Sequence, residues 1–237
     1  MQYQEYQQDY TESAELKKLQ ATFITKVYGW MFLALTITGL VSVFAASSEA
    51  LMQIIYGGGA TTFYMIIGAQ LLLVIGISWG INRISSTVAT LLFLIYAAMF
   101  GLTLSWIFLA YRLDTIASTF FVTSVTFGIM SAIGYFTKKD LSSIGQLLLM
   151  GLIGIIIASI ANWFLQSPML YWIITYVGLF IFIGLVAYDT QKIKKMAIMQ
   201  IENPEAGKKG AIIGALHLYL DFINIFLFLL RILGGRK

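Results

Sequence analysis

The sequence predicts an all-α integral membrane protein with seven transmembrane helices, and three observations lead to that prediction. Of the 237 residues, 59% are hydrophobic and only 11% are charged, whereas soluble domains average roughly 25% charged residues. The mean hydropathy is +0.85. The apolar residues form long runs, each near the roughly 20 residues that a helix needs to cross a bilayer. Because these runs leave no room for a soluble core, we expect a polar tail over residues 1–22 and one transmembrane domain over residues 23–237.

Uncharged runs and the breaks between them locate the helices. The glycine-rich stretch "IYGGGATT" (55–62) separates the first helix from the second, which Arg83 ends. The uncharged run 141–188 is too long for one crossing, and Pro168 divides it because proline disfavours a helical conformation at the residue before it. The predicted spans are 27–48, 61–82, 84–111, 115–137, 144–165, 169–190 and 211–232.

The distribution of basic residues predicts the orientation. With the N-terminus in the cytoplasm, eleven Lys and Arg residues fall on the cytoplasmic side of the seven spans. The opposite side holds four, namely Arg112, Arg231, Arg236 and Lys237. Loops on the cytoplasmic side carry an excess of basic residues in membrane proteins. We therefore expect a cytoplasmic N-terminus and a C-terminus across the membrane.

The residue types present argue against catalysis and against cofactor or nucleic-acid binding. The chain has no cysteine and a single histidine, His217, so it lacks the ligands of the usual zinc site. It has no phosphate-binding loop of the G-x-x-x-x-G-K-[ST] type, and basic residues do not interleave with its aromatic residues. We expect no cofactor and no nucleic-acid partner.

One hydrolase motif is present in a place where it cannot work. "GISWG" (76–80) matches the G-x-S-x-G nucleophile elbow around Ser78, but that motif requires a strand-to-helix turn. Here it falls within a predicted transmembrane helix, where G-x-x-x-G spacing allows close helix packing. We favour packing and expect no enzyme activity. A hydrolase with His217 as its base is the alternative.

Two acids interrupt apolar runs and are the strongest candidates for function. Asp189 lies in "LVAYDTQKIKKM" (185–196) and Asp221 in "GALHLYLDFINIFLFLLRILG" (214–234). An aspartate at the centre of a transmembrane helix costs about 2.5–3.5 kcal/mol on insertion scales and usually faces the bundle interior or a water-filled path. We therefore interpret Asp221 as functional, and not as a residue that only forms hydrogen bonds between helices.

The last predicted helix carries further polar residues on the same stripe. At 100° per residue, His217, Asp221, Asn224 and Arg231 align, so this stripe is expected to face protein. His217 and Asn224 are candidates for lining a pathway, with interhelical hydrogen bonding as the equal alternative. Arg83 is predicted on the same side of the membrane as Asp189 and could pair with it. The residues alone leave open whether Asp189 and Asp221 touch.

Three segments give the chain a resemblance to a known family. "KVYGWMFLALTITGLVS" (26–42), "LVAYDTQKIKKM" (185–196) and "LYLDFINIFLFLLRILG" (218–234) together resemble the transmembrane Bax inhibitor motif family, in its bacterial branch. The resemblance implies a bacterial inner-membrane location and seven helices, with the last one central and surrounded by the other six. His217 departs from the family pattern, which has a small polar residue there.

The resemblance also implies a function. The family is associated with pH-sensitive calcium leak through a pair of aspartates, which by motif would be Asp189 and Asp221. Its latch arginine would fall on Arg83. Two carboxylates in one low-dielectric site cannot both ionise freely, so they would change charge at a pH that a cell can reach. Carboxylate oxygens also suit a hard cation such as calcium, which the pair would hold transiently.

The expected function is therefore a passive, pH-sensitive calcium leak channel in the lipid bilayer. Its expected partners are calcium ions, protons and the surrounding lipid. Two alternatives remain at the level of sequence. The protein could regulate other membrane proteins, such as a quality-control protease or a cell-death factor, or it could be a proton-coupled transporter. The direction of the pH effect is also open, since protonation of Asp189 would release Arg83 but weaken calcium capture.

Overall fold

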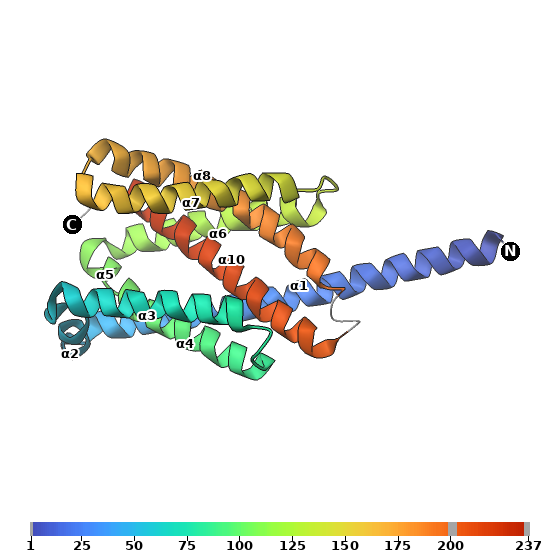
Figure 1. The fold of residues 1–237 in the computed structure, drawn as a ribbon, viewed down its shortest axis with the longest axis horizontal. Helices are drawn as coiled ribbons and strands as arrows, with labels where there is room; N and C mark the ends of the chain where they lie inside the picture. The colour runs from blue at the N-terminus through green and yellow to red at the C-terminus, as the bar shows by residue number, and fades with distance from the viewer. Residues whose placement is uncertain (1, 199–202, 235–237) are drawn as a thin grey trace.

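The computed structural model of the chain describes residues 2–198 and 203–234, and its regular structure in that part is helical, with no strands. Seven of the helices there are long and apolar enough to cross a membrane. Figure 1 shows them as an elongated bundle with the N-terminus extending from one end and the C-terminus at the other. The prediction of an all-α membrane protein with seven transmembrane helices is confirmed.

The long helices and the short ones between them follow one another along the chain. The long helices are α1 (Gln2–Ser47), α3 (Gly59–Gly80), α4 (Ser86–Leu104), α6 (Leu113–Phe136), α7 (Ser142–Leu165), α8 (Pro168–Met196) and α10 (Pro204–Leu233). The short ones are α2 (Glu49–Met52), the π-helical turn η1 (Gln53–Gly57) and α5 (Ile107–Ala110). The glycine-rich stretch after η1 is a turn, as expected, and Gly59 adopts a positive φ of 77° there that suits glycine.

Side-chain caps explain where three of the long helices begin. Ser85, Ser167 and Asn203 precede α4, α8 and α10, and each side chain accepts hydrogen bonds from backbone N–H groups of the first turn. Such caps satisfy donors that have no partner within the helix. Pro168 and Pro204 occupy the first turn, where a missing N–H costs nothing. Pro168 thus separates α7 from α8, as predicted.

Several predicted boundaries were wrong. The third predicted span, 84–111, is interrupted after Leu104, where the Ser105 hydroxyl donates to Leu102 O at 2.6 Å, an alternative to helical backbone bonding. Residues 2–22 of the predicted polar tail form the first part of α1, which does not contradict the prediction that this segment is polar. The last two helices also extend further than predicted, to Met196 and back to Pro204.

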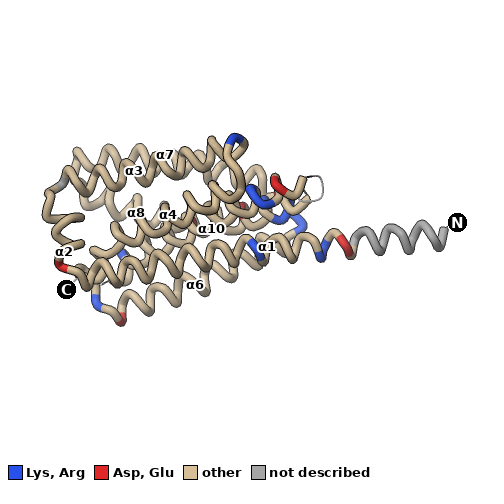
Figure 2. The backbone as a smooth tube through the Cα atoms, turned by 90° about the horizontal axis from the view of Figure 1, so that it is seen from below, with Lys and Arg blue, Asp and Glu red and all other residues tan. Residues whose placement is uncertain are grey.

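The two ends of the bundle differ in charge. The end where α3, α6 and α8 finish, termed the basic end, carries the lysines of 138–139, 192–195 and 208–209. Figure 2 shows most of the Lys and Arg positions gathered at this end of the backbone. Arg112 directly precedes α6, whose last residues are at the basic end, so it lies at the opposite end. Arg236 and Lys237, which entered the predicted charge distribution, lie outside the described residues.

The last helix is the most buried of the seven. Among the described long helices, α10 has the largest buried share and packs closely against α1, α4, α6 and α8. Helix α3 packs on α4, and α7 packs on α8, so both lie at the periphery. Figure 1 shows α10 running obliquely between the other helices. It is therefore central, with four of the other six in close contact.

Glycines set two close helix contacts, but not those that the sequence suggested. A Cβ added at Gly134 of α6 would fall on the backbone of Ala187 in α8, and one at Gly101 would meet Thr38 O of α1. A Cβ at Gly76 or Gly80 of "GISWG" would meet nothing within 4 Å. The interpretation of that motif as a helix-packing site was therefore wrong. The spacing of two glycines does not reveal whether their helix face meets protein or lipid.

Candidate functional site

The two acids singled out by the sequence meet at the interface of α8 and α10. Their carboxyl groups lie close enough for each to act on the charge of the other. Asp221 is only 4% exposed, and its Oδ2 atom has no hydrogen-bond partner among the described residues. An unpartnered buried oxygen is costly. The pair is therefore a place where a proton or a cation would be stabilised.

Two basic side chains lie near Asp189. His217, one turn before Asp221 on α10, and Lys192, on α8, are the charged neighbours that act on the Asp189 carboxyl. His217 is half-buried, and Lys192 is exposed. The site therefore contains a histidine as well as two acids, in agreement with the predicted polar stripe. Along α10, His217 lies one turn closer to the basic end than Asp221 does.

The other predicted site residues do not join the pair. Arg83 is exposed in the turn after α3, and no described residue forms a salt bridge with it. Asn224 donates from its side chain to Leu220 O of its own helix at 2.8 Å, so it makes no interhelical hydrogen bond. Arg231 reaches α8, where Nη1 donates to Thr175 Oγ1 at 3.2 Å.

Apolar side chains close the bundle on the far side of the pair. Ile225, one turn beyond Asp221, is fully buried, and Phe226 and Leu230 follow it. Tyr219, also fully buried, meets the rings of three aromatic residues of α4 edge-on, namely Phe93, Tyr96 and Phe100. Its hydroxyl bonds to Thr38 Oγ1 of α1 at 2.8 Å.

A cavity of about 430 Å³ opens at the basic end. It is lined by Asn82, Glu205 and Lys209 among others, and its deepest α10 residue is Ile213, one turn before His217. The Glu205 carboxylate accepts from Ser86 N at 2.7 Å and from Ser86 Oγ at 3.0 Å, which ties α10 to the start of α4. The acids therefore lie closer to an aqueous cavity at the basic end than to the opposite end.

A polar clamp that the sequence did not reveal holds the 137–141 loop over this region. Gln191, two residues after Asp189, accepts from Leu141 N and donates to Lys139 O, both at 2.8 Å. Lys195 pairs with Asp140 at 2.9 Å. This hydrogen bond and those from Ser142 lower the pKa of Asp140 to about 2. Gln191 lies in the polar stretch "DTQKIKK" (189–195), where nothing in the sequence sets it apart.

The site does not offer a complete calcium shell. Among residues 2–198 and 203–234, no three metal-ligating side chains come together. Calcium takes six to eight oxygen ligands, and Asp189 and Asp221 supply at most four. The residues thus suit transient coordination of a partly hydrated ion and not a resident metal. Water molecules or carbonyl oxygens would have to supply the rest.

The chain was then compared with known proteins. The model of a family described as "Inhibitor of apoptosis-promoting Bax1" matches residues 20–237. The chain belongs to this Bax inhibitor family. The match covers the whole bundle, including both acid-bearing segments, and confirms the resemblance found in the sequence.

Relatives in several bacteria share most of the chain. The inner membrane protein YbhL of Escherichia coli K12 is 49% identical over 218 residues, covering 91% of this chain and 92% of that protein. A Borreliella burgdorferi protein is 42% identical over 97% of this chain and 98% of its own length. RP147 of Rickettsia prowazekii is 41% identical over 97% of this chain and 99% of its own length. The Bax inhibitor fold thus spans nearly all of each protein.

Proposed function

We propose that this protein is a passive, pH-sensitive calcium leak channel, with Asp189 and Asp221 as the proton sensor and the ion-binding step. The observation that carries the proposal is the proximity of these two acids on α8 and α10. Two carboxyl groups at one buried site exchange a proton as a unit. Their joint charge decides whether a divalent cation is attracted.

The surroundings of the pair support passage from the basic end. The cavity lined by Asn82 and Lys209 reaches to within one turn of His217. The apolar layer of Ile225, Phe226 and Leu230 supports a gate on the other side. The described conformation then corresponds to a closed channel, and opening requires α10 to move relative to its neighbours. Small movements of packed helices are sufficient for such gating.

Arg83 enters the proposal as a latch that engages in a different conformation. It follows Asn82, which lines the cavity at the basic end. The basic residues that act on Asp189 in the described conformation are His217 and Lys192. Pairing of Arg83 with Asp189 would neutralise the acid and block its approach to calcium. Protonation of Asp189 would release the arginine.

The proposal includes a location and an orientation. A relative that is 49% identical is named as an inner membrane protein, and we assign the same membrane to this chain. The excess of lysine at the basic end supports a cytoplasmic N-terminus. The partners are then calcium ions and protons, and the protein has no enzymatic role. Ser78 lies within α3, away from any strand-to-helix turn.

Calcium flux through the purified full-length chain in liposomes tests the proposal. When calcium is added outside vesicles that contain the protein and a calcium-sensitive dye, the dye signal should rise. Vesicles with the dye but without the protein should show no rise. The rate should depend on pH between about 5 and 8, where paired carboxyl groups exchange protons. Absence of flux at every pH would remove the channel proposal and favour regulation of other membrane proteins. Uphill calcium movement driven by a proton gradient would identify a transporter instead.

A further inference from the structure

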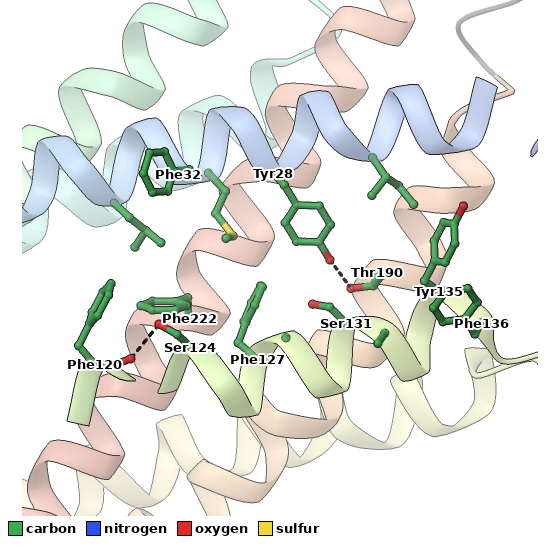
Figure 3. A pocket seen from close by; sticks show the side chains of 15 residues that line it. Tyr28, Phe32, Phe120, Ser124, Phe127, Ser131, Tyr135, Phe136, Thr190 and Phe222 are labelled. Carbon is green, nitrogen blue, oxygen red and sulfur yellow. Dashed lines mark hydrogen bonds between the residues drawn. The ribbon is translucent and has the colours of Figure 1, made fainter. Parts of the chain in front are cut away.

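A long apolar groove lies between α1 and α6, and its back wall includes Thr190 and Phe222, the sequence neighbours of Asp189 and Asp221. Its volume is about 500 Å³, which is within the range of roughly 300–1,000 Å³ for ligand sites. Figure 3 shows side chains of both helices facing this space, with Thr190 of α8 and Phe222 of α10 behind it. Helices α1 and α6 meet chiefly through the rings of Tyr28 and Phe127, whose centroids are 6.3 Å apart.

The groove opens toward the membrane hydrocarbon. Phe32 on α1 and Phe136 on α6 both line it, and they are 70% and 76% exposed. Both helices belong to candidate membrane spans. The surrounding medium in a bilayer is lipid, so the occupant available to such a lateral groove is an acyl chain.

The dimensions of the groove match one leaflet. Its lining runs from Ile24 to Leu35 on α1 and from Phe120 to Phe136 on α6, which are lengths of about 16 and 24 Å at 1.5 Å per residue. The hydrocarbon of one leaflet is about 15 Å thick, half of the roughly 30 Å core. The groove runs along the helices, as lipid chains do. An acyl chain can therefore lie in it at full length.

One polar atom inside the groove has no partner. Ser131 is 8% exposed and lines the groove, and its Oγ makes no hydrogen bond among the described residues. The neighbouring hydroxyls of Tyr28 and Thr190 bond to each other at 3.3 Å. Figure 3 shows Ser131 beside this pair. A buried hydroxyl without a partner is unfavourable, and it can donate to an ester carbonyl of a bound ligand.

A cation stands at the end of the groove near the basic end. Lys194 Nζ donates to Tyr135 O at 2.9 Å and lies 5.0 Å from the centre of the Tyr135 ring, which itself lines the groove. An ammonium group has three donors, so it can also bind a phosphate. Ser131 lies five residues before the end of α6, about 7.5 Å along the helix. This depth agrees with an ester placed just below a headgroup phosphate, since the interfacial layer is roughly 5–7 Å thick.

We propose that the groove between α1 and α6 is a binding site for one phospholipid. Its acyl chain lies along Phe127 and Phe222, its ester carbonyl accepts a hydrogen bond from Ser131, and its phosphate binds Lys194. Occupancy of this site is measured by binding, so the test does not depend on ion flux.

The groove can be filled by substitution at a glycine. A Cβ added at Gly128, which lines it, would meet nothing within 4 Å, so Gly128→Leu introduces a side chain at an open position of the groove. Gly154 of α7 is matched to it, because it is also exposed in a long helix and equally open, but it lies outside the groove. Gly154→Leu is therefore the control.

Native mass spectrometry of the full chain, titrated with palmitoyl-oleoyl phosphatidylglycerol, tests the proposal. Wild type and Gly154→Leu should each retain one lipid at low lipid concentration. Gly128→Leu should bind it at least tenfold more weakly, and Ser131→Ala several-fold more weakly. Retention of no lipid by wild type, or equal affinity in folded Gly128→Leu, would overturn the site.

A second measurement uses the unaltered protein and so does not depend on the folding of any variant. Phosphatidylglycerol with a photoreactive group at the end of one acyl chain is incorporated into liposomes with the full chain. Crosslinks should concentrate at the deep end of the groove, near Leu35, Phe120 and Phe222. Crosslinks spread evenly over the lipid-facing residues of α3 and α7 would contradict a specific site.

Discussion

Asp189 of α8 and Asp221 of α10 lie close enough inside the bundle for each to act on the charge of the other, although 32 residues separate them in the chain. Helices α8 and α10 are antiparallel, so the end of α8 at Met196 and the start of α10 at Pro204 both lie at the basic end (Figure 1). A carboxyl pair of this kind titrates as one unit. Changes at either acid should therefore have the same functional consequence.

The first prediction concerns removal of one or both charges. Asp189→Asn and Asp221→Asn should each flatten the pH dependence of calcium flux into proteoliposomes between about pH 5 and 8. The double variant should add little to either single change, because coupled groups are not independent. A folded double variant with the full wild-type pH profile would remove the pair from the mechanism.

The acids could be identified from the sequence, but their proximity could not. An aspartate in an apolar run is visible in one dimension, since its cost in a bilayer sets it apart. Their proximity depends on the register of α8 against α10, which no local pattern specifies. The roles of Gln191 and Lys194 were missed for a related reason, because their partners are backbone carbonyls of a neighbouring segment, Lys139 O and Tyr135 O.

The helix boundaries could likewise be predicted only where a local sequence feature fixes them. Pro168 marked the start of α8 because proline restricts the backbone locally, and the charge at Arg83 marked the end of the second span. The break after Leu104 depends on Ser105, whose hydroxyl lies near both Met52 and Tyr56 of a distant segment. Hydropathy alone cannot show such a break. It also placed the end of α8 too early and the start of α10 too late, because both helices continue past the apolar region.

The second prediction tests the latch. Arg83→Ala should increase calcium leak near neutral pH if the arginine restrains Asp189 in a closed conformation. Because Arg83 is exposed, the substitution should change the free energy of unfolding by less than about 0.5 kcal/mol. Arg112→Ala, at an exposed arginine of the opposite end, is the matched control and should leave the leak unchanged. An unaltered or reduced leak in Arg83→Ala would argue against the latch.

The third prediction concerns the close contact of α6 with α8. Gly134→Ala should destabilise the protein by about 1–3 kcal/mol, the usual cost of overpacking, because the added Cβ falls on the Ala187 backbone. Gly128→Ala, on the same helix with open space around it, should be neutral or stabilising, since alanine favours helix. Thermal unfolding in detergent measures both. Equal stability of the two variants would mean that α6 can move away from α8 freely.

The fourth prediction concerns orientation. The chain has no cysteine, so single cysteines report position without interference. Asp114→Cys and Lys138→Cys change exposed residues near opposite ends of α6. A membrane-impermeant maleimide added to spheroplasts should label Asp114→Cys and leave Lys138→Cys unlabelled until the membrane is opened. The reverse pattern would place the N-terminus outside the cytoplasm.

The fifth prediction concerns the ion pair that holds the 137–141 loop. Hydrogen bonds from Lys195 and Ser142 lower the pKa of Asp140 to about 2. A carboxyl group with a lowered pKa in the folded chain stabilises it above the ordinary value of about 3.9, and this stabilisation is lost as the pH falls toward the folded value. The contribution is small because both side chains are exposed.

Carbon-13 NMR of aspartate-labelled protein measures this titration directly. The Asp140 carboxyl resonance, assigned by its absence in Asp140→Asn, should have a midpoint near pH 2 in wild type. In Lys195→Met the midpoint should rise toward about 3.9, because the largest cause of the lowering is the hydrogen bond from Lys195. Lys192→Met, which removes a nearby exposed lysine of the same helix, should leave the midpoint in place. A midpoint that is the same in wild type and Lys195→Met would show that Lys195 does not hold the loop in solution.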